Sequence, residues 1–129
     1  MHAQGRNQAD RFLNDLISLF GREHIIVESV LRPGEDDMGA ELADLAHKHR
    51  LPLAAAGGVT MASPKSKYRA DLLCALRQSK SLDEIRYLLP AQHSFLKSAE
   101  EMLALHRMAP QAVSNAAGIA RECYYPMSF

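Results

Sequence analysis

The order of three segments between residues 24 and 56 constrains the fold more than any other feature of the sequence. The stretch "HIIVESVL" at 24–31 is rich in β-branched residues and predicts a strand that ends at the turn-forming "RPG". Leucine and alanine at helical spacing predict a helix over 38–49, and the apolar run 51–56 predicts a second strand. A strand, a helix and a strand in this order form a right-handed parallel crossover. The sequence therefore predicts an α/β fold.

The rest of the chain is predicted to be helical, with about six helices in a single domain over 1–129. A proline suited to a first helical turn follows Ser63, and Ser98 with Glu101 three residues later forms a capping-box pattern. Besides the crossover helix, the expected helices are 9–20, 63–80, 81–87, one from 98 through "AEEMLALHRMA", and 110–123.

Two parallel strands are too few to make the whole sheet of a stable domain. Their outer edges would leave backbone groups unpaired. We therefore expect neighbours from a partner chain, as in a homo-oligomer, or from the remainder of a larger α/β domain.

Composition excludes several classes of protein. Fifteen basic and fifteen acidic residues give a formal net charge of zero, so no global field attracts nucleic acid or a membrane surface. The polar opening "MHAQGRNQADR" is not a secretory leader, and no apolar run reaches the length of a membrane span, so we expect a cytoplasmic protein. Cys74 and Cys123 lie far apart in apolar helical contexts, which favours reduced core thiols.

The stretch "LPLAAAGGVTMASP" at 51–64 delivers the second strand to a tip of Gly57, Gly58, Val59 and Thr60. In parallel sheets this carboxyl end of a strand is where ligands and catalytic side chains usually lie. Two glycines and a threonine supply little chemistry there.

Five blocks in order resemble the later part of the polymerase and histidinol phosphatase (PHP) domain of bacterial C-family DNA polymerases. They are "FGREHIIVESVL", "LADLAHKHRLPLAAAGGVTM", "YRADLLCALRQSKSLDE", "FLKSAEEMLAL" and "PQAVSNAAGIARECYY". This family comprises the DNA polymerase III α subunit and its error-prone relative, and "AAAGGVTM" is most similar to the error-prone branch. The resemblance implies a partial PHP barrel-like fragment.

The resemblance also implies that the metal site is degenerate. The family carries an Asp and a His, both metal ligands, where this chain has Gly58 and Thr60. Glycine has no donor and a lone threonine hydroxyl is a poor ligand for a divalent metal, so we expect no metal and no cofactor at this tip. The family's other ligands would lie before residue 1 and its polymerase aspartates after Phe129, so we expect no catalysis from this chain alone.

The remaining polar clusters give weaker signals. His47 and His49 are two residues apart, whereas helical metal pairs use a spacing of three or four, so we expect the six histidines to be solvated or singly hydrogen-bonded. A basic run could contact a phosphate backbone or could be a solvated face; it holds Lys65, Lys67, Arg69, Arg77 and Lys80.

Three hypotheses follow from these observations. The leading one is a non-catalytic PHP homologue with a structural or protein-contact role in DNA replication or repair synthesis. The second is a metal-dependent phosphoesterase with an atypical ligand set. The third is a small nucleic-acid-binding module that uses the basic helix at 65–80.

Overall fold

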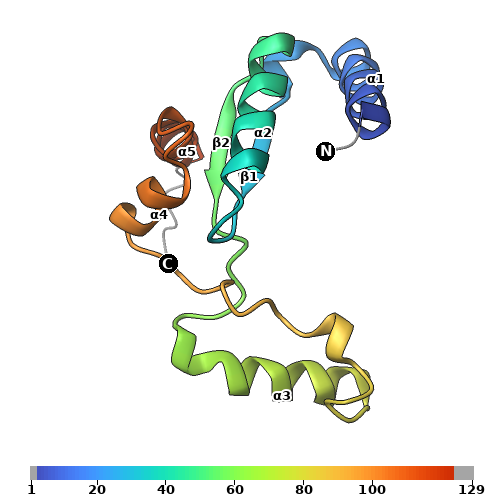
Figure 1. The fold of residues 1–129 in the computed structure, drawn as a ribbon, viewed down its shortest axis with the longest axis vertical. Coiled ribbons are helices and arrows are strands. Elements are labelled where there is room, and N and C mark those ends of the chain that lie inside the picture. The colour runs from blue at the N-terminus through green and yellow to red at the C-terminus, as the bar shows by residue number, and fades with distance from the viewer. Residues whose placement is uncertain (1–2, 124–129) are drawn as a thin grey trace, which may run out of the picture. The chain divides into compact units, whose positions relative to one another are not determined.

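The computed structural model describes residues 3–123, and within them the chain forms five α-helices and two strands (Figure 1). The helices are α1 (Ala3–Phe20), α2 (Asp36–His49), α3 (Lys67–Gln78), α4 (Ala99–Leu105) and α5 (Gln111–Glu122), and the strands are β1 (Val27–Val30) and β2 (Leu53–Ala56). The helix-rich α/β prediction is confirmed.

The expected helix over 81–87 is wrong, which lowers the number of α-helices from six to five in the described part of the chain. The backbone amide and hydroxyl of Ser81 both donate to the Glu84 carboxylate, at 2.9 and 2.7 Å. This closes a turn, and only a short 3-10 helix, Arg86–Leu88, follows before Pro90. Ser81 and Glu84 have the spacing of a helix start, but too few helix-forming residues follow them.

The parallel crossover is confirmed. Strand β1 pairs with β2 in parallel, with Val27 opposite Leu53 and Val30 opposite Ala56, and α2 connects them. Both strands are shorter than the sequence suggested. Ile25 and Leu51 lie outside the ladder, although both are buried.

The chain divides into two compact units, residues 1–56 with 99–129 and residues 57–98. We describe each by itself, and the expected single-domain organisation stays a prediction.

The first unit packs helices against its two-stranded sheet. Alternate residues of β1 are buried, and β2 buries Leu53 and Ala55. They join Ala46 of α2 and Ala112 of α5 in one apolar cluster. On the other face of β1, Glu28 and Val30 remain exposed, so the described residues leave that face of the strand uncovered. Parallel sheets are normally covered on both faces.

A buried histidine connects β1 to the turn between α4 and α5. His106 is only 2% exposed, and its Nε2 lies 3.1 Å from the Ser29 carbonyl oxygen. Its Nδ1 lies 3.1 Å from the Met102 carbonyl oxygen, so both ring nitrogens face acceptors. His106 was expected to be solvated or to make one hydrogen bond. Its burial contradicts the first alternative, and the second still holds for a neutral ring, which has one N–H to donate to either carbonyl.

The second unit closes around α3. Thr60 and Met61 donate their backbone amides to the Ser94 carbonyl at 2.8 and 3.1 Å, and Leu96 donates back to Met61 at 3.1 Å. Met61, Ala75 and Ile85 are its buried residues. Among the described residues of the whole chain, no helix is long and apolar enough to cross a membrane.

We predict that His106→Leu lowers the free energy of unfolding by about 1–3 kcal/mol, because the buried Ser29 carbonyl loses the donor that the ring supplies. Chemical denaturation monitored by circular dichroism measures the change. The matched control is His47→Leu on the exposed surface of α2, which should leave the midpoint nearly unchanged. Equal effects of the two substitutions would contradict the assigned role of His106.

Candidate functional site

The strand tip that the sequence singled out is held by backbone bonds of the 57–98 unit. Gly58 has φ of +53°, a left-handed conformation that glycine adopts without strain. The Thr60 hydroxyl lies 3.4 Å from the Ser94 carbonyl oxygen, to which the Thr60 backbone amide also donates. Both residues at the expected ligand positions therefore have a structural use.

The described residues contain no group of three or more histidine, cysteine or acidic side chains arranged to hold a metal ion. Both cysteines are free thiols. Cys74 is half-buried and its thiol lies 3.6 Å from the Leu88 carbonyl, whereas Cys123 is exposed. The expectation that Cys123 is a core residue is wrong, because it lies just after α5 ends.

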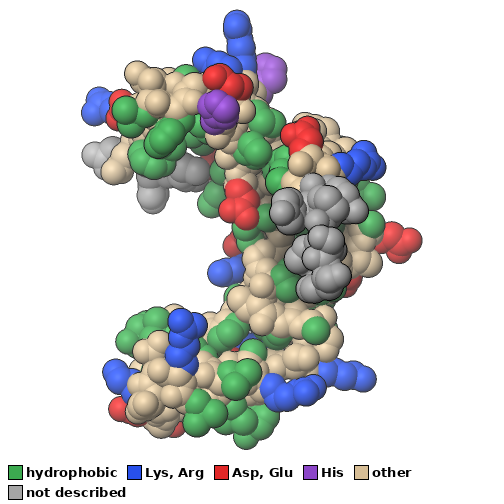
Figure 2. All heavy atoms as spheres, turned by 180° about the vertical axis from the view of Figure 1, so that it is seen from behind, with side chains coloured by type: hydrophobic (Ala, Val, Ile, Leu, Met, Phe, Trp, Pro, Cys, Tyr) green, Lys and Arg blue, Asp and Glu red, His purple; other side chains and the backbone are tan. Residues whose placement is uncertain are grey.

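The basic residues are spread around the 57–98 unit and do not form one stripe. Lys67 pairs with Asp71 one helical turn later, so its charge is locally neutralised. Lys65 precedes α3, Lys80 follows it, and Arg69 and Arg77 are exposed on the helix. Figure 2 shows hydrophobic side chains next to the basic ones over this unit.

The neutral net charge conceals a segregation of charge along the chain. Residues 57–98 contain seven lysines and arginines against three carboxylates, a formal charge of +4. The remaining residues contain eight against twelve, a formal charge of −4. Counting charge by segment would have revealed this in the sequence.

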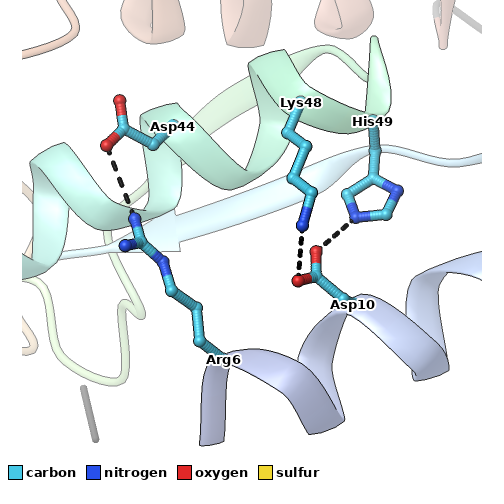
Figure 3. A network of polar contacts seen from close by, with 5 residues as sticks. All are labelled: Arg6, Asp10, Asp44, Lys48 and His49. Atoms are coloured by element: carbon cyan, nitrogen blue, oxygen red, sulfur yellow. Dashed lines mark hydrogen bonds and ion pairs between the residues drawn. The ribbon is translucent and has the colours of Figure 1, made fainter. Parts of the chain in front are cut away.

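A polar network that sequence reasoning missed joins α1 to α2 (Figure 3). Asp10 accepts from Lys48 at 2.6 Å and lies 2.7 Å from Nε2 of His49. Arg6 lies 3.4 Å from Asp44 at the exposed end of the network. Arg6 and Asp10, and Asp44 and Lys48, are each four residues apart, so the two helices carry matching charges in register. This four-residue spacing of opposite charges was the one signal of a contact between the two helices that the sequence offered.

The Asp10 network has the geometry of a structural link between helices. Hydrogen bonds from Lys48 and then His49 lower the pKa of Asp10 below its ordinary value of 3.8, against the opposing effect of desolvation. His49 is only 8% exposed. Among the described residues, no serine, threonine or cysteine side chain is hydrogen-bonded to His49, so the pair lacks the nucleophile of a catalytic triad.

We predict that Asp10→Asn lowers stability at neutral pH and flattens its acid dependence. A carboxylate with a lowered pKa contributes stability above its ordinary value, and that contribution is lost as pH falls through the folded pKa. The urea midpoints of wild type and variant should therefore differ at pH 7 and converge only as the pH falls below 3.8 and through the lowered pKa of folded Asp10.

The control for this prediction is Asp44→Asn, in the same network but with an exposed partner. It should change the midpoint little at either pH. If the urea midpoints of wild type and Asp10→Asn differed by the same amount at neutral and at acid pH, an electrostatic link between the helices would be contradicted.

Comparison with known proteins identifies the chain's relatives. No family model matches it. It is 36% identical over 126 residues to the error-prone DNA polymerase of Nocardia farcinica, covering 95% of this chain and 11% of that protein. It is 32% identical over 127 residues to that of Mycolicibacterium paratuberculosis, covering 96% and 12%. It is also 32% identical over 124 residues to that of Mycobacterium tuberculosis, covering 94% and 11%.

These relationships show that the chain is homologous to DNA polymerases. It is homologous, over nearly all of its length, to a segment of error-prone DNA polymerases, and it spans about 11% of the length of the relatives it matches. The resemblance to bacterial DNA polymerases that five sequence blocks indicated is thereby confirmed, including the error-prone branch, whereas the assignment to the PHP domain stays a prediction.

Proposed function

We propose that this chain is a non-catalytic homologue of the PHP part of an error-prone DNA polymerase. Its role would be structural, or to make protein contacts in DNA replication or repair synthesis. The observation that carries the proposal is the composition of the tip at 57–61, where the resemblance implies that Gly58 and Thr60 replace the family's Asp and His ligands. The homology to error-prone polymerases supplies the context.

The geometry of the tip supports this role. A ligand site keeps donor atoms available for the metal. Here the Thr60 hydroxyl faces the Ser94 carbonyl, and Gly58 supplies a left-handed turn with no side chain. The tip therefore acts as the first part of the bridge that closes the 57–98 unit.

The partners that fit this proposal are a second copy of the chain or the remainder of a polymerase, in the cytoplasm. A strand with one uncovered face and a segregation of charge both favour association with another protein surface.

We predict that the purified chain does not hold stoichiometric metal and does not hydrolyse phosphodiesters. After incubation with Mn²⁺ or Zn²⁺ and gel filtration, metal analysis by mass spectrometry should find well below one ion per chain. Bis(p-nitrophenyl) phosphate should remain intact. Stoichiometric metal together with hydrolysis would favour the phosphoesterase hypothesis.

The matched comparison is the double variant Gly58→Asp/Thr60→His, which introduces two donors of the kind that divalent metals bind. Aspartate tolerates the left-handed conformation at residue 58 better than most residues. The variant should retain more Mn²⁺ than wild type, which would show that the measurement reports on the tip.

The charge of +4 over residues 57–98 favours nucleic-acid binding as a second candidate function. That candidate predicts a salt-sensitive gel shift with single-stranded or duplex DNA that disappears in Lys65→Ala/Lys67→Ala/Arg69→Ala. The structural role predicts that, at physiological salt, DNA migrates equally far in the gel whether it is mixed with the wild-type chain or with the triple variant. The pairing of Lys67 with Asp71 and the hydrophobic residues between the basic ones favour the structural role.

A further inference from the structure

Helix α3 presents an unusually apolar outward face. Tyr68, Leu73 and Leu76 are 66–73% exposed, and Leu72 is exposed beside them. Their spacing places them along one side of the helix. Arg69 lies among them and has no hydrogen bond or ion pair with any described residue. We call Tyr68, Arg69, Leu72, Leu73 and Leu76 the α3 face.

A groove runs beside the α3 face. It has a volume of about 550 Å³, and its lining combines apolar residues such as Leu72, Leu76 and Leu82 with polar ones such as Ser79, Lys80 and Glu84. Its leucines can contact a hydrophobic side chain of another surface, and its polar residues can bond to polar groups beside that side chain.

Helix α1 presents a second exposed apolar face. Leu13 and Ile17 point to the core of the first unit, whereas Phe12, Leu19 and Phe20 are 60–75% exposed. Asp15 is exposed, lies within one helical turn of Phe12 and Leu19, and has no partner among the described residues. We call Phe12, Asp15 and Leu19 the α1 face, whereas helical spacing places Phe20 on the side of Leu13 and Leu16, which pack against the core.

The two faces complement each other. The α3 face is mainly aliphatic and contains an arginine without a partner among the described residues, and the α1 face combines Phe12 and Leu19 with an aspartate that likewise has none. Apolar helix faces associate through residues at i, i+3, i+4 and i+7, with aromatic side chains as anchors in grooves. The units that carry them have formal charges of +4 and −4, so the wider electrostatics favour the same contact.

We propose that the α3 face of one copy binds the α1 face of a second copy, with Arg69 of each chain paired to Asp15 of the other. A second copy is the occupant because every copy carries both faces. Two copies that exchange both contacts would leave neither the α1 face nor the α3 face unpartnered, and this reciprocal exchange is the twofold arrangement that we propose. The chain's zero net charge adds no long-range repulsion between copies.

This proposal deepens the protein-contact role proposed above by naming its partner and surface. Its test reads molecular mass, whereas the test of the non-catalytic role reads bound metal and hydrolysis. The failure of one therefore leaves the other intact.

Sedimentation velocity of the full chain from about 1 to about 100 µM tests the proposal. We expect a concentration-dependent shift from the 14.3 kDa monomer toward twice that mass. Arg69→Glu and Asp15→Arg should each raise the dissociation constant about tenfold or more, and the combined swap should restore most of the affinity. Leu76→Asp should also weaken the dimer, without the possibility of charge rescue.

The matched control is Arg121→Glu, an exposed charge reversal on α5, which should leave the dissociation constant unchanged. Circular dichroism confirms that each variant remains folded. A 14.3 kDa mass at every concentration would overturn the proposal. A dimer that Arg69→Glu and Asp15→Arg leave unchanged, or whose affinity the combined swap does not restore, would also overturn it.

Discussion

A parallel sheet of two strands holds together only when other parts of the chain cover it, and this constraint organises the first unit. Helix α5, from the far end of the sequence, packs on β2 and places Ala112 in the core. Its Asn115 donates to the Leu53 carbonyl at 2.8 Å. His106 adds a second polar link, from the turn before α5 to β1. Segments more than 60 residues apart thus fix the sheet, while the outer face of β1, with Glu28 and Val30, stays open.

Local patterns predicted the crossover and most helices, because hydrophobic periodicity and capping residues act over a few neighbouring residues. The turn at Ser81–Glu84 imitated a helix start, which explains the extra predicted helix. The roles of His106 and Asp10 depend on partners 77 and 38 or 39 residues away, and no local pattern specifies such partners. For the contacts of Asp10 with α2, the sequence carried one signal, which is the matched spacing of charges on α1 and α2.

The sequence alone could single out the tip at 57–61, because its interpretation depends on which residues stand there, and the absence of a metal site at the tip stays a prediction. Sequence resemblance marked Gly58 and Thr60 as departures from a ligand pair, and the structure adds what they do: a left-handed turn and a hydrogen bond to the Ser94 carbonyl. The segregation of charge between the two units could also be found in the sequence, but only by counting charges segment by segment, because the whole chain is neutral.

We propose that residues 57–61 have a structural role and do not bind a metal. Paramagnetic broadening in ¹H–¹⁵N spectra tests it most directly, because Mn²⁺ broadens the amides nearest to where it binds. We expect stoichiometric Mn²⁺ to broaden the Thr60 and Met61 amides, both bonded to Ser94, no more than other amides of the chain. Selective loss of the signals of residues 57–61 and 94–96 at one equivalent of Mn²⁺ would contradict the structural role.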